Sequence, residues 1–242
     1  SEMCIRDRKK GVLNESIVST ELGLKGIPNI SESINMYRDI EILRYSGGKI
    51  HIPYVTTSKG VDLIREAKKN NLDITASVSL AHITFSEKDI PEFDTNYKLI
   101  PPLRSESDLN SLKEGLVDGT LDYLTSMHEP FDIDNKKIVF DNASSGSIGL
   151  ESMFGLMSNQ FTLEKTIDIL TRKKIIFEVD DHPIEIGSLA DLSLFNPDKN
   201  YNFSENHILS TSKNCAFIDS KHKGIVYGSI NGKNFTLNKL WT

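Results

Sequence analysis

The order of the segments between Lys49 and Met127 constrains the fold of this chain more than any other feature. Strand-forming residues mark Lys49–Thr56, Asp73–Ser79 and Leu121–Ser126. The segments between them are long enough to hold helices and to connect parallel strands. These strands carry many polar residues, whereas the central strands of an open parallel sheet are nearly all apolar. The order therefore predicts an α/β fold whose parallel sheet belongs to a barrel.

Apolar spacing and cap residues predict the helices. Met36, Ile40 and Leu43 recur at the spacing of one helix face. Ser58 is expected to cap the second helix and Ser105 the third, because serine is a favoured N-cap residue. The predicted helices are Ser31–Tyr45, Lys59–Lys69, Asp108–Gly119, residues 148–160 and residues 163–170.

From Ile175 onward the sequence changes to short β segments separated by glycine and asparagine. The segments expected as strands are Ile175–Val179, Leu192–Phe195, Lys213–Phe217, Gly224–Ile230 and Phe235–Leu237. The dipeptide Asn231-Gly232 predicts a tight hairpin. The expected domains are a partial barrel over 11–174 and a small β subdomain over 175–242. Residues 1–10 are rich in charge and are expected to be disordered or foreign to the fold.

Composition excludes several classes of partner. A formal net charge of −6 gives no basic surface for nucleic acid or for an anionic membrane. No apolar run approaches the roughly 20 residues that a membrane-spanning helix needs. Two cysteines, Cys4 and Cys215, do not make a disulfide framework, which favours the reducing cytoplasm.

Several short motifs stand in a recognisable order along the chain. They are Gly23–Pro28, Lys49–Thr57, Pro101–Arg104, Gly149–Ser152, Ala190–Leu192 and the strand-to-turn stretch 121–130. Together they resemble dihydroorotase and related cyclic amidohydrolases, and the last stretch is similar to the family's Ser/Thr-Asp-His-x-Pro motif. The resemblance implies the C-terminal part of a TIM-type (β/α)8 barrel, its last three or four strand–helix units, followed by a small β subdomain. Because a whole barrel takes about 250 residues, we expect the sequence to be a piece of a longer protein.

The resemblance also implies a chemistry and exposes where this chain departs from it. The family uses zinc to activate water for reversible hydrolysis of dihydroorotate to N-carbamoyl-L-aspartate, a step of pyrimidine biosynthesis. At one of the family's metal-ligand positions this chain has Tyr54, whose phenol stays protonated near neutral pH. At the metal-binding, proton-shuttling aspartate it has Met127, whose thioether accepts no proton and suits soft metals. Ile100 replaces a substrate-binding asparagine, and Phe131 replaces a histidine that closes the site. No metal ligand and no cofactor is therefore predicted for this chain.

The remaining polar residues of the motifs each have two interpretations. His128 follows the proton-shuttle position and is a catalytic candidate, but a loop histidine bonded to backbone is the alternative. Glu129 next to it resembles an acid–base partner, although adjacent residues in a turn need not face each other. His51 matches a histidine that is not a ligand in the family, which favours a packed or capping histidine. His82 lies in a matching loop, and no catalytic role is predicted for it.

Arg104 is the candidate for substrate binding. A guanidinium can hold a carboxylate with two parallel hydrogen bonds, as dihydroorotate would require. The alternative is a structural ion pair with Glu106 or Asp108, which follow it closely in the sequence.

Three functions are compatible with these residues. The first is a dihydroorotase-like amidohydrolase with impaired or absent catalysis. The second is a non-catalytic scaffold that binds another enzyme of the pyrimidine pathway, such as aspartate transcarbamoylase. The third is a hydrolase of a different cyclic amide. The expected partners are a second copy of the chain or that pathway enzyme.

Overall fold

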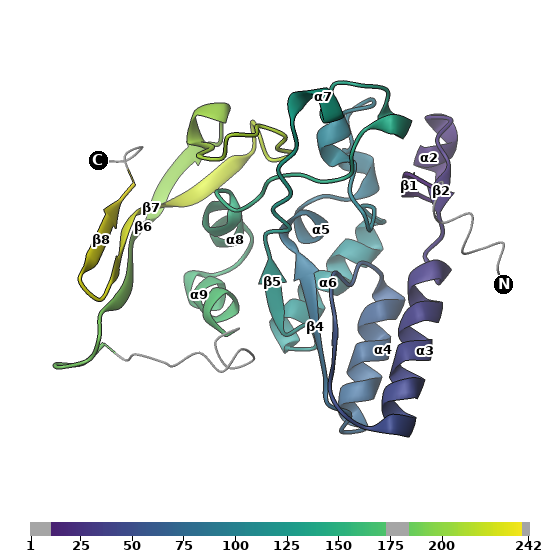
Figure 1. Cartoon of the computed structure of the whole chain (residues 1–242), viewed down its shortest axis with the longest axis horizontal. Coiled ribbons are helices and arrows are strands. Elements are labelled where there is room, and N and C mark those ends of the chain that lie inside the picture. The colour runs from purple at the N-terminus through teal and green to yellow at the C-terminus, as the bar shows by residue number, and fades with distance from the viewer. Residues whose placement is uncertain (1–10, 173–183, 239–242) are drawn as a thin grey trace. The chain divides into compact units, whose positions relative to one another are not determined.

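The computed structural model describes residues 11–172 and 184–238. These residues form two compact units (Figure 1). The first contains residues 11–150 and Ser210–Ala216, and the second contains residues 151–172, 184–209 and 217–238. The domain boundary expected between residues 174 and 175, like the disorder expected for residues 1–10, lies outside the described residues. The division into a partial barrel and a β subdomain therefore stays a prediction.

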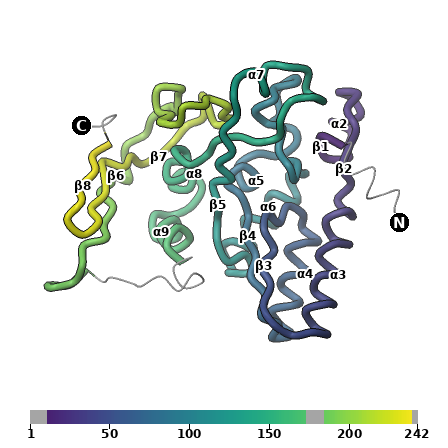
Figure 2. The backbone as a smooth tube through the Cα atoms, viewed as in Figure 1, coloured from purple at the N-terminus to yellow at the C-terminus, as the bar shows by residue number. Residues whose placement is uncertain are grey.

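A parallel sheet of three strands forms the centre of the first unit. Its strands are β3 (Ile50–Ile52), β4 (Ile74–Ser79) and β5 (Tyr123–Thr125), with β4 in the middle (Figure 2). The pairing is parallel on both sides of β4. The predicted succession of strands and helices, the parallel pairing and the α/β class are confirmed, although β3 and β5 are shorter than the sequence analysis expected.

Helices connect these strands and supply the apolar core. They are α3 (Ile30–Ser46), α4 (Ser58–Lys69) and α6 (Glu106–Asp118), and α4 packs between the other two. Ile64, Leu112 and Leu116 on their inner sides are fully buried, as are Ala76 and Val78 of the sheet. The predicted helices match these three elements to within a residue or two at each end.

The caps show how the helices are tied to one another. Thr57, rather than the expected Ser58, caps α4, because its hydroxyl accepts the Gly60 amide at 3.0 Å. Ser105 caps α6 as predicted and accepts the Asp108 amide at 3.2 Å. The Asp108 carboxylate in turn accepts the Ser58 amide at 2.8 Å, so α6 helps to cap α4.

Shorter elements surround the sheet of the first unit. They are β1 (Leu13–Asn14), α2 (Ile17–Glu21), β2 (Gly26–Ile27), α5 (Leu80–Thr84) and α7 (Ile133–Lys136), with 3-10 turns at Glu87–Asp89, Thr95–Tyr97 and Phe140–Asn142. β1 pairs in parallel with β2. The strand expected at Lys213–Phe217 was wrong, because no strand forms there. Asn214 instead uses its polar groups in loop contacts, accepting the Ile148 amide at 2.9 Å and the Phe131 amide at 3.1 Å.

The second unit combines two helices with an antiparallel sheet. It contains α8 (Met153–Gln160), α9 (Leu163–Thr171), β6 (Asp191–Asn202), a 3-10 turn at Glu205–His207, β7 (Lys221–Asn231) and β8 (Asn234–Leu237). The strands pair in the order β6-β7-β8. The phenyl rings of Phe154 on α8 and Phe195 on β6 pack edge to face at 4.9 Å, which joins helix to sheet.

Two further predictions concern this unit. The helix expected from residue 148 begins only at Met153. The hairpin predicted from Asn231-Gly232 is confirmed, with the loop displaced by one residue, because Asn231 pairs with Asn234 and Gly232 adopts φ 57°. The strand expected at Ile175–Val179 lies outside the described residues.

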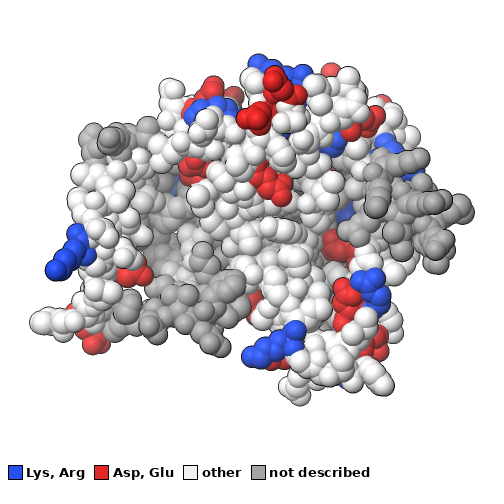
Figure 3. All heavy atoms as spheres, viewed as in Figure 1, with Lys and Arg blue, Asp and Glu red and all other residues white. Residues whose placement is uncertain are grey.

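Charge is mixed on one face of the surface. On the face drawn in Figure 3, acidic and basic side chains are interspersed rather than gathered by sign. Among the described helices, none is long and apolar enough to cross a membrane.

Candidate functional site

The carboxyl ends of β3 and β5 carry the two residues expected at metal-ligand positions. Tyr54 stands two residues beyond β3, and Met127 stands two residues beyond β5. Since the strands are parallel, both residues follow the same edge of the sheet. Each has a left-handed backbone, with φ 53° at Tyr54 and 46° at Met127. Residues other than glycine rarely adopt this conformation, and such exceptions gather at functional sites.

Neither residue is suited to hold zinc at this edge. Tyr54 offers a phenol and the buried Met127 offers a thioether, a soft ligand that cannot replace a carboxylate. The donors at these two positions therefore do not fit the ligand set of a hydrolytic zinc site. Within residues 11–172 and 184–238, no group of three His, Cys, Asp or Glu side chains is arranged to hold a metal ion.

A buried histidine fixes the loop next to this edge. His82, on α5 immediately after β4, shares a 2.6 Å hydrogen bond between Nδ1 and the Ser79 hydroxyl. Its Nε2 lies 3.0 Å from the Pro101 carbonyl, which can only accept, so Nε2 carries the proton. Burial lowers the pKa of His82 to about 4, which keeps the ring neutral. His82 therefore positions the 101–104 segment. The sequence signal that could have revealed this role is Ser79, which ends β4 three residues before His82.

Arg104 lies at the end of that segment and is buried. One terminal nitrogen donates to the Asn14 side-chain oxygen at 2.7 Å and to the Ile27 carbonyl at 2.6 Å. Its Nε donates to the Thr56 hydroxyl at 3.2 Å. These three bonds direct the guanidinium into the protein and join β1, β2 and the loop after β3. The role predicted for Arg104 in binding a substrate carboxylate stays a prediction.

Glu32, in the first turn of α3, holds the loop that contains Tyr54. Its carboxylate accepts the Thr56 amide at 3.1 Å, the Thr57 amide at 3.0 Å and the Thr57 hydroxyl at 2.8 Å. The Thr56 hydroxyl donates to the other carboxylate oxygen. The sequence analysis missed this residue, because its partners lie 24 and 25 positions away.

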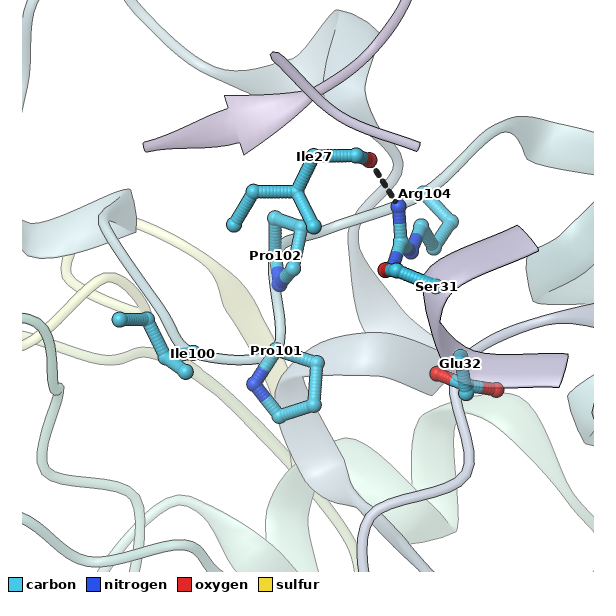
Figure 4. A pocket seen from close by; sticks show the side chains of 7 residues that line it. All are labelled: Ile27, Ser31, Glu32, Ile100, Pro101, Pro102 and Arg104. Carbon is cyan, nitrogen blue, oxygen red and sulfur yellow. Dashed lines mark hydrogen bonds between the residues drawn. The ribbon is translucent and has the colours of Figure 1, made fainter. Parts of the chain in front are cut away.

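A pocket lies between these groups (Figure 4). Its lining residues are Ile27, Ser31, Glu32, Ile100, Pro101, Pro102 and Arg104. It encloses about 250 Å³, part of it open solvent. Glu32 and Arg104, the charged residues of its wall, already bond to backbone and side chains as described above. Ile100, at the position expected for a substrate-binding asparagine, adds an apolar side chain that cannot hydrogen-bond a ligand.

The loop after β5 contains His128 and Glu129. The Leu150 amide donates to Nδ1 of His128 at 3.3 Å, and a parallel bridge pairs His128 with Ser147. The Glu129 side chain packs so closely against Gly146 that a Cβ there would lie 2.5 Å from its Oε2. Burial raises the pKa of Glu129, against the opposing charge of Lys136. The catalytic role considered for His128 stays a prediction.

Two buried lysines hold this loop from inside. Nζ of Lys98 donates to the carbonyls of Phe140 at 2.7 Å, Asp141 at 2.9 Å and Ala143 at 2.7 Å. Nζ of Lys136 donates to the carbonyls of Thr95 at 2.6 Å, Ser144 at 2.8 Å and Gly146 at 2.9 Å. Burial, with the nearby charge of Lys98, lowers the pKa of Lys136 to about 8. The two ammonium groups thus bind together the segment that follows β5, and Lys136 also ties it to the 3-10 turn that begins at Thr95.

His51 belongs to a polar cluster on the sheet. Its Nδ1 lies 2.9 Å from the Thr75 hydroxyl, and its Nε2 lies 3.2 Å from the Ser77 hydroxyl and 3.0 Å from that of Tyr123. The imidazole stacks on the Tyr123 ring at 5.1 Å. Burial lowers the pKa of His51, while Asp122 opposes the shift. This is the packed histidine that the sequence analysis favoured.

Sequence comparison finds relatives among bacterial enzymes. The chain is 36% identical over 226 residues to the dihydroorotase of Caldanaerobacter subterraneus subsp. tengcongensis, covering 90% of this chain and 52% of that enzyme. It is 34% identical over 226 residues to the dihydroorotase of Thermoanaerobacter sp. strain X514, with the same coverage of 90% and 52%. The chain thus spans about half the length of the curated relatives it matches. No family model matches it.

Structural comparison finds TIM-barrel amidohydrolases. The L-hydantoinase (dihydropyrimidinase) of Arthrobacter aurescens has a TM-score of 0.78 at 18% identity, covering 98% of this chain and 54% of that one. The inactive dihydroorotase-like domain of the Chaetomium thermophilum CAD-like multifunctional protein has a TM-score of 0.58 at 18% identity, covering 81% and 53%. At these identities the likeness concerns the fold alone.

Proposed function

The chain is a homologue of the dihydroorotases, and we propose that its zinc-dependent hydrolysis of dihydroorotate is impaired or lost. The family reaction opens the cyclic amide of dihydroorotate to give N-carbamoyl-L-aspartate. It needs a water made nucleophilic at neutral pH, which the family obtains from zinc. At the two ligand positions within this chain, the side chains are the phenol of Tyr54 and the thioether of Met127.

One observation carries this proposal. Tyr54 and Met127 keep left-handed backbones at the carboxyl ends of two parallel strands, but their side chains cannot serve as hard metal ligands. Ile100 at the edge of the pocket, in place of a substrate-binding asparagine, supports the same conclusion. A pseudoenzyme of the amidohydrolase fold accounts for both the family-like frame and the unsuitable ligands.

The proposed architecture follows from the same homology. The sheet β3-β4-β5 and its helices would be part of the last three or four strand–helix units of a (β/α)8 barrel, and β6–β8 would be part of the small β subdomain. Support comes from the TIM-barrel neighbours, of which the chain covers about half. We further propose a cytoplasmic location, which the low cysteine content favours.

The test is the zinc content of the purified full-length protein, measured by elemental analysis alongside dihydroorotate hydrolysis. The Caldanaerobacter dihydroorotase, purified in parallel, is the positive control. The expected result is no stoichiometric zinc and no turnover above background. Roughly two zinc ions per chain together with turnover would overturn the proposal. In a protein that supplies the family's remaining ligands, Tyr54→His with Met127→Asp is expected to regain zinc.

A second candidate function is that of a scaffold for another pyrimidine-pathway enzyme, such as aspartate transcarbamoylase. The observation that favours it is the retention of an ordered frame, including the Glu32 and Arg104 bonds, around a site that has lost its ligand side chains. Co-purification of the two proteins at micromolar concentration would support this function, and independent elution would count against it. Turnover of a cyclic amide other than dihydroorotate would instead favour the hydrolase of a different cyclic amide that the sequence analysis considered.

A further inference from the structure

Two loops of the first unit are bonded to each other. One is the 86–97 segment between α5 and α6, and the other is the 129–142 segment that follows β5. The Thr95 hydroxyl donates to the Lys136 carbonyl at 2.7 Å, and the Lys136 ammonium donates to the Thr95 carbonyl at 2.6 Å. Ile90 packs against the buried apolar cluster that contains Phe140. These contacts join the two loops into one surface.

Four large apolar residues are exposed where the loops meet, and we call them the loop surface. They are Phe93 (49% exposed), Ile133 (59%), Ile138 (45%) and Val139 (71%). Phe93 stands between Ile90 and Thr95, the two residues through which its own loop contacts the other loop. The other three members stand within three positions of Lys136, which holds the opposite end of these bonds. Apolar residues that gather at the surface in this way indicate a contact site.

The backbone at Phe93 supports a role in contact rather than in packing. Phe93 has a left-handed backbone with φ 55°, which a bulky side chain rarely adopts. The turn around it is fixed, because the Asp94 amide donates to the Pro91 carbonyl at 3.1 Å and the Asp94 carboxylate accepts the Asn96 amide at 2.9 Å. Such a conformation persists only where the surrounding structure enforces it. Here it leaves about half of an aromatic residue exposed.

Carboxylates surround the loop surface. Residues 86–98 and 129–142 contain eight acidic residues, which are Glu87, Asp89, Glu92, Asp94, Glu129, Asp132, Asp134 and Asp141. The same ranges contain four lysines, so their net charge is −4 out of the −6 of the whole chain. Lys98 and Lys136 are buried with their ammonium groups on carbonyls, and Glu87 is also buried. Lys88 and Lys137 are exposed among the remaining carboxylates, which outnumber them.

This combination of groups selects the kind of partner. An apolar centre with a charged rim is the usual composition of a protein interface. The acidic rim attracts a basic partner, whereas it repels nucleic acid and anionic membranes. A second copy of this chain fits less well, because an isologous contact would place the acidic rim against itself.

We propose that the loop surface docks a basic amphipathic helix of a partner protein. The apolar side of that helix would lie on Phe93, Ile133, Ile138 and Val139, and its lysines and arginines would face the surrounding carboxylates. None of the four residues lines the pocket described above. The proposal therefore goes beyond the proposed function, and the contact requires neither the presence nor the loss of zinc.

The experiment measures binding of a synthetic amphipathic helix of leucine and lysine, about four turns long, to the full-length protein by fluorescence anisotropy. The expected result is a dissociation constant on the order of micromolar. Binding should weaken as salt is raised, because salt screens the attraction between the lysines and the carboxylates. The same helix with glutamate in place of lysine should not bind.

Two double variants test the apolar centre and the acidic rim separately. Ile133→Ser with Val139→Ser removes apolar contact area and should weaken binding by at least about tenfold. Asp132→Asn with Asp134→Asn removes two negative charges and should weaken binding by about tenfold at low salt. The rim variant should also reduce the salt dependence, which the loss of apolar area should leave unchanged.

Matched control variants change the same kinds of side chain elsewhere. Ile34→Ser with Ile42→Ser alters two residues of α3 that are 57% and 56% exposed. Glu164→Gln with Asp198→Asn removes two exposed negative charges from the second unit. Each control pair should change the affinity by less than about twofold.

Three results would overturn the proposal. They are no binding to the unaltered protein, equal binding of the glutamate helix, and equal weakening by the surface and control variants. Circular dichroism checks that each variant folds. Hydrogen exchange of the unaltered protein with the lysine helix is a second measurement that needs no variant, and protection should appear at 91–97 and 133–139. Protection confined to other segments would contradict the proposal, whereas zinc content and turnover bear on the proposed function alone.

Discussion

Tyr54 and Met127 share one backbone conformation at equivalent places, each two residues beyond a parallel strand and each with positive φ. Aspartate, asparagine and histidine tolerate this conformation better than tyrosine or methionine. Aspartate and histidine are also the side chains expected there from the dihydroorotase resemblance. The backbone therefore suits the absent ligands better than the residues now present.

The first prediction tests that conformation at Tyr54. In ordinary backbone regions alanine is more stable than glycine by roughly 0.5–1 kcal/mol. At φ 53° the order should invert. The free energy of unfolding from urea titration should therefore be about 1 kcal/mol higher for Tyr54→Gly than for Tyr54→Ala. The matched pair is Tyr45→Gly and Tyr45→Ala in helix α3, where alanine should be the more stable. The same order at both positions would contradict the left-handed assignment.

The second prediction concerns Glu32, which accepts hydrogen bonds from both Thr56 and Thr57. Glu32→Gln removes the charge and turns an acceptor oxygen into a donor facing other donors. The expected loss is about 2–3 kcal/mol in the free energy of unfolding from urea titration. Glu41→Gln, on the exposed side of the same helix, should stay within about 0.5 kcal/mol. Similar losses for the two variants would mean that the bonds to the threonines contribute little.

The helices and the hairpin could be predicted because their signals are local. Met36, Ile40 and Leu43 sit within two turns of α3, and Asn231-Gly232 adjoins the turn it predicts. Glu32 could not be identified, since its partners become neighbours only after folding. The same holds for Lys98 and Lys136, which bond to carbonyls, a group that every residue carries and that no sequence pattern marks.

The strand expected at Lys213–Phe217 is an error of another kind, a predicted element that does not form. The residues of that segment have a strand-like composition, but Asn214 bonds with both its backbone and its side chain to the loop after β5. A long-range polar network therefore overrode a local preference. The positions of Tyr54 and Met127 were predicted from motif order, whereas their left-handed backbones were not, because neither residue type favours that conformation.

The third prediction follows from His82, whose folded pKa of about 4 lies below its ordinary 6.5. Above pH 6.5 both folded and unfolded states hold it neutral, and its contribution to stability is complete. As pH falls from 6.5 toward 4, only the unfolded state gains the proton, so stability is lost in that window. Between pH 7 and pH 5 the loss from His82 should be about 2 kcal/mol. His222, also with a pKa lowered to about 4 by burial, should add to the slope.

The variant for this test is His82→Gln, with unfolding by urea measured at pH 7 and pH 5. It should be less stable than the unaltered chain at pH 7, because the bond to the Pro101 carbonyl is weakened. From pH 7 to pH 5, the free energy of unfolding of His82→Gln should fall by about 2 kcal/mol less than that of the unaltered chain. His207→Gln, at a histidine that is only partly buried, serves as the comparison. An unchanged pH dependence in His82→Gln would show that other groups cause the acid destabilisation.

The fourth prediction concerns Lys136 and the loop after β5. Lys136→Met keeps the aliphatic stem but leaves the carbonyls of Thr95, Ser144 and Gly146 without their donor. Buried acceptors that lose a partner cost about 1–3 kcal/mol each where water cannot replace it, so a total loss of at least 3 kcal/mol is expected. Lys137→Met, at the exposed neighbouring position, should be nearly neutral. The three carbonyls belong to separate places, two in that loop and one in the 3-10 turn at Thr95, so losing the ammonium should loosen the loop. Limited proteolysis should therefore cut the 129–147 segment faster in Lys136→Met than in the unaltered chain, and Lys137→Met should show no such increase. Equal cleavage of both variants would mean that the ammonium does not hold the loop.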